Sequence, residues 1–267
     1  SEANNFDHFI HKSCKDGPYL FDYLTEMAEV VAEYDNRLIV YENYPDPKLG
    51  DIRDEYRRYY DIKPGVCTPF YFEGLAMHWG ADHTRKFITD ALEILKPGDL
   101  PVFCFGNHDQ IRSVSRWGRE QARLVSVMQL TLPGMPCVYY GDEIGMENVD
   151  ISAAQSLDQF SADGIFGSRD AERTPMQWDD SPQAGFSTAR PWLPVHEEYQ
   201  QNNLAAQLQD DGSFFRLYKT LLGLRSADDT MLKGALQLVE SDNPELVIYD
   251  RTTSQSEYRI ILNYSEH

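Results

Sequence analysis

Two carboxylates in this sequence come directly after apolar segments that are typical of strands. Residues 102–105 lead through Gly106 into Asn107-His108-Asp109, and residues 37–41 lead into Glu42. In a barrel of parallel strands the catalytic groups lie at the carboxyl ends of the strands, so both carboxylates are candidates for chemistry. A pair of carboxyl groups is also what glycoside hydrolysis requires. The pattern therefore predicts a glycosidase site that contains Glu42 and Asp109.

The elements that must position these groups alternate between helix and strand. Phe87, Ile88, Ala91, Leu92 and Leu95 share one helical face before Pro97-Gly98, for example. We expect helices at residues 22–34, 53–60, 85–95, 119–132 and 214–225, and strands at 37–41, 65–72, 102–105 and 137–140. Such alternation is typical of an α/β fold with a parallel barrel.

Two later regions depart from this alternation. Residues 148–203 form a long irregular stretch rich in Pro, Gly, Asp and Trp, and the aromatic residues favour an ordered, functional loop. Residues 245–250 and 257–263 alternate like antiparallel strands. We therefore divide the chain into residues 1–225, which carry the barrel, and residues 226–267, which begin a small β domain.

The charge of the chain favours a neutral ligand. Lys and Arg number 24 against 43 Asp and Glu, which gives a formal charge of −19. Such a charge repels nucleic acids and anionic membranes, although it also serves simply as a soluble surface. We expect neither nucleic acid nor membrane as a partner, and the sequence leaves the oligomeric state open.

The cysteines and histidines predict no metal site and no cofactor. Cys14, Cys67, Cys104 and Cys137 lack CxxC spacing, and none of the seven histidines forms an HxH or HxxxH pair. Two of the cysteines lie within apolar segments, where buried reduced thiols are the norm. Together with the lack of a signal peptide and of any apolar run of 18 residues, this favours a cytoplasmic protein.

Several motifs, in the correct order, resemble the α-amylase family of glycoside hydrolases, family 13, and most closely its α-glucosidase and oligo-1,6-glucosidase branch. Asn107-His108-Asp109 is similar to the motif that follows the seventh barrel strand. Residues 132–146 resemble the region of the eighth strand, and residues 169–179 resemble a signature of the exo-acting branch. The resemblance implies the second half of a (β/α)8 TIM barrel followed by the start of an antiparallel β domain.

The sequence departs from the family pattern at two places. The family usually has glycine before the acid/base glutamate, where this chain has Tyr41. The family nucleophile lies in a GFRxD-like motif after the fourth strand, and no such motif occurs in this sequence. We therefore expect strands one to four and the nucleophile to lie upstream of Ser1, and the 267 residues alone to be inactive.

The resemblance also implies a role for each site residue. Glu42 would be the general acid and base, and Asp109 would bind ring hydroxyls and stabilise the transition state. His108 would donate to the same sugar, and Arg169 would hold the far hydroxyl of a terminal glucose. Arg112 would orient a catalytic carboxylate or bind substrate.

Each of these residues also has a structural alternative. Glu42 could pair with Arg37 or Arg53, Arg169 could pair locally with Asp170, and Arg112 could form a structural salt bridge. Trp178 and Trp192 could line sugar subsites or form a small core of the loop.

Three functions follow from the resemblance. The first is a retaining α-glucosidase that removes terminal glucose from short neutral α-glucoside oligosaccharides. The second keeps the chemistry but changes the acceptor, as in sucrose isomerases and maltose transglucosidases. The third is a non-catalytic α-amylase-like scaffold. Preference between α-1,4 and α-1,6 bonds cannot be read from these residues.

Overall fold

A computed structural model describes residues 17–47, 50–152, 154–158 and 168–265, so Cys14 and part of the predicted loop lie outside the described residues. The amino-terminal half of the described chain forms a parallel sheet whose strands are neighbours in the order β1-β2-β3-β4. These strands are β1 (Ile39–Tyr41), β2 (Cys67–Tyr71), β3 (Val102–Cys104) and β4 (Met135–Cys137). Because all four run the same way, the segments that follow them emerge at one edge of the sheet.

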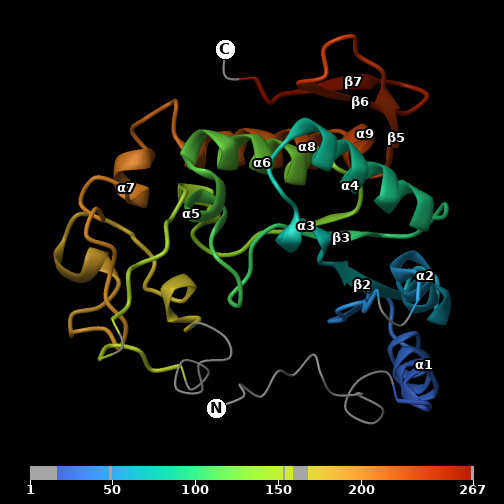
Figure 1. Ribbon diagram of the computed structural model, residues 1–267, viewed down its shortest axis with the longest axis horizontal. Coiled ribbons are helices and arrows are strands. Elements are labelled where there is room, and N and C mark those ends of the chain that lie inside the picture. Colours follow the sequence, from blue (N-terminus) through green and yellow to red (C-terminus); the bar gives the residue numbers. More distant parts are fainter. Residues whose placement is uncertain (1–16, 48–49, 153, 159–167, 266–267) are drawn as a thin grey trace.

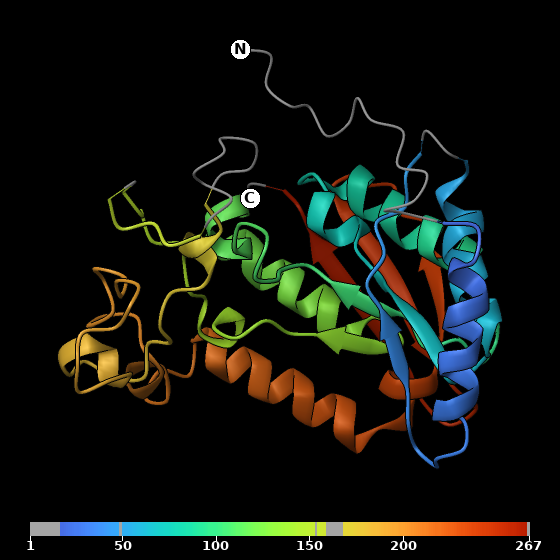
Figure 2. The ribbon, with the colours of Figure 1, turned by 90° about the horizontal axis from the view of Figure 1, so that it is seen from below.

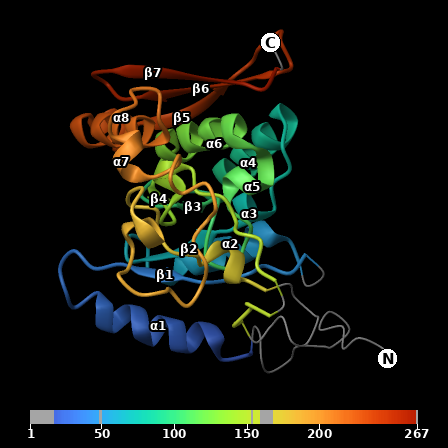
Figure 3. The ribbon, with the colours of Figure 1, turned by 90° about the vertical axis from the view of Figure 1, so that its left-hand side faces the viewer.

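Helices connect and cover these strands. They are α1 (Leu20–Val31), α2 (Ile52–Ile62), α3 (Glu73–Ala76), α4 (Ala81–Ile94), α5 (Ser113–Trp117) and α6 (Arg119–Thr131). The Asp51 side chain caps α2 by accepting from the backbone N–H of Arg53. Figure 3 shows the strands in sequence order, with α1 beyond β1 and with α4 and α6 on the other side of the sheet.

The main core lies between the parallel sheet and its helices, and aromatic residues dominate it. Phe87 of α4 contacts Tyr71 of β2, Phe103 of β3 and Phe105, with ring centroids 5.3 to 5.7 Å apart. All four side chains are buried. The apolar face predicted from the sequence for this helix is therefore the face that packs on the sheet.

A second sheet packs against the outer face of α4 and α6 (Figure 1). It is antiparallel and consists of β5 (Ala235–Val239), β6 (Leu246–Thr252) and β7 (Glu257–Asn263). The fully buried Arg251 of β6 donates to the carbonyl of Thr131 at the end of α6 and to that of Gly234 at 2.9 Å. The sequence predicted β6 and β7 but missed β5, and the domain boundary at residue 225 stays a prediction.

The eighth-strand segment differs from the prediction. Residues 137–140 were expected to form this strand, whereas β4 covers Met135–Cys137. The register pairs Val102 with Met135 and Cys104 with Cys137, so β4 ends opposite the last residue of β3. Beyond that point the Tyr139 N–H donates to the Asp142 carboxylate, at 3.1 Å, and the chain turns into a 3-10 helix at Asp142–Ile144.

The described part of the long loop lies together at one side of the parallel sheet (Figures 1 and 2). It contains 3-10 turns at Asp170–Glu172 and Pro182–Gly185, and it is followed by α7 (Leu204–Gln207), α8 (Phe214–Ala227) and α9 (Asp229–Lys233). Thr174, Gln177 and Leu193 are at most 1% exposed. The described part of the loop is thus packed, in agreement with the ordered loop that the sequence predicted.

None of the helices in the described part of the chain is both long and apolar enough to cross a membrane.

Candidate active site

Glu42 directly follows β1 and turns towards solvent. Its Oε1 accepts a hydrogen bond from the Tyr44 hydroxyl at 3.1 Å. The two arginines that could have neutralised Glu42 have other partners: Arg37 donates to backbone carbonyls, and Arg53 pairs with Asp51 and Glu93. The structure therefore leaves the Glu42 carboxylate accessible at the end of its strand.

Tyr44 places Glu42 and Asp109 in one electrostatic environment. Burial raises the pKa of the Tyr44 phenol, and the negative charges of Glu42 and Asp109 raise it further. The Tyr44 ring also packs on Phe72, which follows β2, with centroids 4.8 Å apart. The segments after β1 and β2 thus contact each other, and Tyr44 was not singled out from the sequence.

Asp109 is held by two arginines from the long loop. Its Oδ1 accepts from Arg169 at 2.9 Å and from Arg173 at 2.7 Å. The Asp109 side chain is 22% exposed, so these ion pairs are partly shielded from water. Asn107 braces the turn by accepting from the Asp109 backbone N–H at 2.9 Å. The two guanidinium groups fix the position of the Asp109 carboxylate.

Asp158 holds the Arg169 side chain in the position from which it binds Asp109. Asp158, whose side chain is 5% exposed, accepts from Arg169 Nε at 2.8 Å and from the Arg169 backbone N–H at 3.0 Å. The neighbouring Asp170 instead accepts from Ser156 and from backbone N–H groups. The alternative of an Arg169–Asp170 pair is therefore not what the structure shows.

His108 lies beside Asp109 and remains open to a ligand. Its side chain is 60% exposed, and its Nε2 lies 3.6 Å from Asp109 Oδ2. The His108 carbonyl accepts from Arg173 Nε at 2.8 Å, so the arginine fixes the backbone and leaves the ring accessible. This placement suits the predicted contact to a sugar.

Arg112 lies beneath the site rather than in it. Its side chain is almost completely buried, and its guanidinium donates to the carbonyls of Tyr140 and Glu172, both at 2.7 Å. The guanidinium also lies 4.9 Å from the ring centroids of Tyr139 and Tyr140. Since these carbonyls belong to the segments after β4 and around residue 172, Arg112 joins the two loops, and it forms no ion pair with a carboxylate of the described residues.

Asn43 has a buried amide without a partner in the described structure. The residue is 5% exposed, and neither its Nδ2 nor its Oδ1 makes a hydrogen bond there. Leaving a buried polar group unpaired costs about 1 to 3 kcal/mol. Asn43 adjoins Glu42, so this unused hydrogen-bonding capacity lies at the candidate site.

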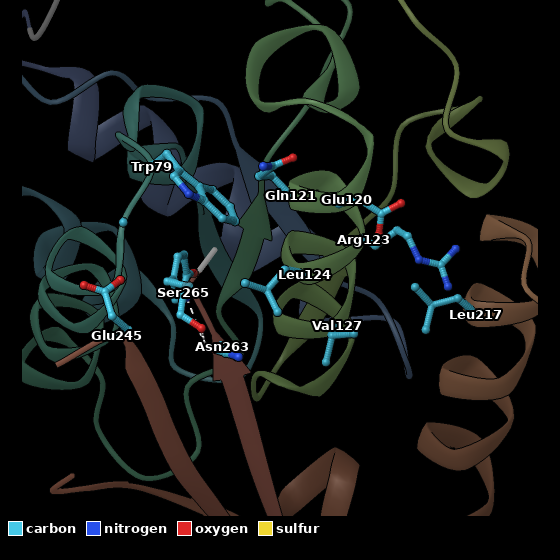
Figure 4. A pocket seen from close by; sticks show the side chains of 12 residues that line it. Trp79, Glu120, Gln121, Arg123, Leu124, Val127, Leu217, Glu245, Asn263 and Ser265 are labelled. Carbon is cyan, nitrogen blue, oxygen red and sulfur yellow. Dashed lines mark hydrogen bonds between the residues drawn. The ribbon is translucent and has the colours of Figure 1, made fainter. Parts of the chain in front are cut away.

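Two cavities of the described structure differ in their relation to the candidate site. One, of about 280 Å³, is lined by Arg173, Trp178, Phe186 and Trp192 among others, and these rings are too exposed to be a loop core. The other, of about 930 Å³, lies between the starts of α4 and α6 and the end of β7 (Figure 4). Its lining includes Trp79 but neither Glu42 nor Asp109, so it is separate from the candidate site.

No group of three or more His, Cys, Asp or Glu side chains among the described residues could hold a metal ion.

The pKa of Asp142, in the 3-10 helix that follows β4, predicts how the stability of the protein depends on pH. Burial raises its pKa from 3.8 to about 7, although Arg112 and the Tyr139 N–H act against the shift. The folded state prefers the protonated form of Asp142. The stabilisation of the folded state by this protonated carboxyl is therefore complete below about pH 4 and is lost as the pH rises to about 7.

We expect the free energy of unfolding of Asp142→Asn to equal that of the original protein at pH 4 and to be about 2 kcal/mol higher at pH 8. This is roughly half of what the full pKa difference would give, because part of the side chain is exposed. Urea unfolding across this pH range measures the difference. Curves that stay parallel from pH 4 to pH 8 would contradict it.

The sequence itself decides the family. Residues 1–234 match the model of the alpha-amylase catalytic domain. The chain belongs to the alpha-amylase family. This membership confirms the family predicted from the motifs, and it makes β1 to β4 with their helices part of a (β/α)8 barrel. The antiparallel sheet is the small β domain that the sequence predicted.

Known members of the alpha-amylase family show how much of such a protein this chain represents. It is 38% identical over 202 residues to an alpha-glucosidase of Apis mellifera, covering 70% of this chain and 35% of that protein. It is 30% identical over 289 residues to an oligo-1,6-glucosidase of Parageobacillus thermoglucosidasius, and this match covers 94% of this chain and 50% of that protein. The chain thus spans about a third to a half of these relatives.

A solved structure confirms the fold. The trehalulose synthase MutB of Pseudomonas mesoacidophila superimposes with a TM-score of 0.77 at 25% identity, over 94% of this chain and 51% of that one. The fold therefore agrees with the family that the sequence indicates.

Proposed function

We propose that this chain supplies the acid/base carboxylate and the transition-state-stabilising carboxylate of a retaining α-glucosidase. The observation that carries the proposal is that Glu42 and Asp109 follow strands of one parallel sheet, where Tyr44 donates to Glu42 and where Arg169 and Arg173 hold Asp109 in place. The relatives named alpha-glucosidase and oligo-1,6-glucosidase support the same reaction.

Each residue has a defined part in this reaction. Glu42 gives its proton to the glycosidic oxygen as the bond breaks, and then takes a proton from the water that attacks the glycosyl-enzyme. Asp109 offers negative charge to the oxocarbenium-like sugar. We place the nucleophile, which forms the covalent intermediate, outside these 267 residues. The domain division at residue 225 is part of this proposal.

The substrate that we propose is a short neutral oligosaccharide with a terminal α-linked glucose. Asp109 Oδ1 accepts from two arginines, whereas the accessible His108 ring lies 3.6 Å from Oδ2. Oδ2 and the His108 ring therefore offer an acceptor and a donor to adjacent sugar hydroxyls. Arg169 would close the far side of the pocket.

Product analysis with maltose, isomaltose and sucrose tests the proposal. The 267-residue protein alone is expected to release no glucose, because double displacement needs a nucleophile. Joined to the part of the Parageobacillus relative that the match leaves uncovered, it should release glucose from maltose or isomaltose. Turnover by the chain alone, abolished by Glu42→Gln, would contradict our account of the nucleophile.

A second candidate is sucrose isomerisation, and the likeness to trehalulose synthase supports it. In that case the same joined protein would convert sucrose to an isomer such as isomaltulose with little free glucose. A folded joined protein that turns over none of the three sugars would instead support the scaffold alternative.

A further inference from the structure

Cys104 and Cys137 face each other on neighbouring parallel strands. Each is the last residue of its strand, and the register of β3 and β4 pairs the two positions directly. Neighbouring strands lie about 4.8 Å apart, which is inside the range of about 4.4 to 6.8 Å that disulfides span between Cα atoms. Both thiols are free, and neither is part of a disulfide.

The two thiols differ in access and in acidity. Cys104 is 1% exposed, whereas Cys137 is only half-buried. The neighbouring Cys104 lowers the pKa of the Cys137 thiol, despite burial and the nearby Asp142 carboxyl, whereas Cys137 and burial raise the pKa of Cys104. Because the thiolate is the reactive form, Cys137 is the thiol that an oxidant would reach and oxidise first.

Cys67 provides an internal comparison. It is 3% exposed and lies 3.5 Å from the Tyr41 hydroxyl, and burial raises the pKa of its thiol. Cys67 is therefore expected to stay unreactive under conditions that oxidise Cys137.

We propose that Cys137 and Cys104 form a hydroperoxide-sensitive thiol pair, which closes to a disulfide between β3 and β4. The Cys137 thiolate attacks one oxygen of the hydroperoxide, the O–O bond breaks, and the leaving oxygen takes a proton as water or an alcohol. Cys104 then attacks the sulfur of the resulting sulfenic acid. The S–S bond forms, the S–O bond breaks, and the hydroxide leaves as water with the Cys104 proton.

The disulfide would act on the loop that carries Asp109. In the reduced protein the Cys104 thiol donates to the Gly106 carbonyl at 3.1 Å, and oxidation removes this donor. Gly106 directly precedes Asn107-His108-Asp109. A Cβ atom at Gly106 would lie 3.6 to 3.7 Å from the Asp142 carboxylate oxygens, so the backbone passes close to this carboxylate. The inference holds whether or not the site hydrolyses glucosides.

Treating the folded 267-residue protein with hydrogen peroxide, followed by blocking of thiols and peptide mass mapping, tests the proposal. We expect a cross-linked pair of peptides that contain Cys104 and Cys137 and lack two hydrogens, and dithiothreitol should restore both thiols. Cys67 should stay free, with oxidation at least about tenfold slower than that of Cys137. Hydrogen exchange of residues 105–109 should change on oxidation.

Three variants separate the roles. Cys104→Ser should stop the reaction at a Cys137 sulfenic acid that dimedone traps, Cys137→Ser should leave Cys104 reduced, and Cys67→Ser should form the disulfide like the original protein. Oxidation of Cys137 to sulfinic acid without a link in the unaltered chain would overturn the proposal. Equal oxidation of Cys67 and Cys137 would do so as well, and neither result depends on whether a variant folds.

Discussion

Replacing Glu42 by glutamine is expected to lower kcat/KM for maltose by about 10²- to 10⁴-fold in the active protein assembled around this chain. Glutamine preserves the size of the side chain and can still accept from Tyr44, but it carries no proton for the departing oxygen. The loss should be much smaller with p-nitrophenyl α-glucoside, since a nitrophenolate leaves without protonation. Initial rates with the two substrates measure this difference.

The matched control for Glu42→Gln is Glu73→Gln. Glu73 also follows a strand of the parallel sheet, burial raises its pKa, and it accepts from the Tyr56 hydroxyl at 3.2 Å. It is not among the groups that surround Asp109, so its replacement should leave both rates within about threefold. An equal loss with the two substrates in Glu42→Gln would show that Glu42 positions the substrate and does not protonate it.

Replacing Asp109 by asparagine is expected to lower kcat by about 10²- to 10³-fold, equally for maltose and p-nitrophenyl α-glucoside. The amide keeps the shape of the side chain and removes the fixed negative charge beneath the developing oxocarbenium ion. Because this charge serves the sugar and not the leaving group, the aglycone should not matter. Steady-state kinetics with both substrates measure the effect.

Asp158→Asn provides the comparison for the Asp109 variant. It weakens the anchor of Arg169 without touching the proposed sugar contact, so KM should rise more than kcat falls. A large dependence of the Asp109→Asn effect on the aglycone would contradict the charge-stabilising role and assign proton transfer to Asp109.

Features that depend on local sequence were predictable. The apolar run before Glu42 predicted the end of β1 at Tyr41, and the run at 102–105 predicted β3 to within one residue, since β3 ends at Cys104. The helical face of residues 85–95 was visible for the same reason, although α4 begins earlier, at Ala81. Prediction failed for β5, whose side chains are largely exposed or half-buried and lack a strong apolar face.

Features that depend on contacts between distant segments were not predictable. Arg173 was visible in a motif, yet only the packing of the loop reveals that it binds Asp109 and the His108 carbonyl. Asp158 and Tyr44 carry no signal of their own. The burial of Arg112 depends on where two loops place their carbonyls, and sequence spacing contains no information about that.

The outer strands of the parallel sheet limit how this chain can join another. In the described residues β1 pairs with β2 alone and β4 with β3 alone, and each outer strand is three residues long. An added strand would gain only a few backbone hydrogen bonds at either edge, and short edges of this kind resist indiscriminate stacking. Stable association with another polypeptide segment would therefore depend on side-chain contacts. A segment that formed hydrogen bonds with the Asn43 amide would be preferred over one that paired only with the strand backbone.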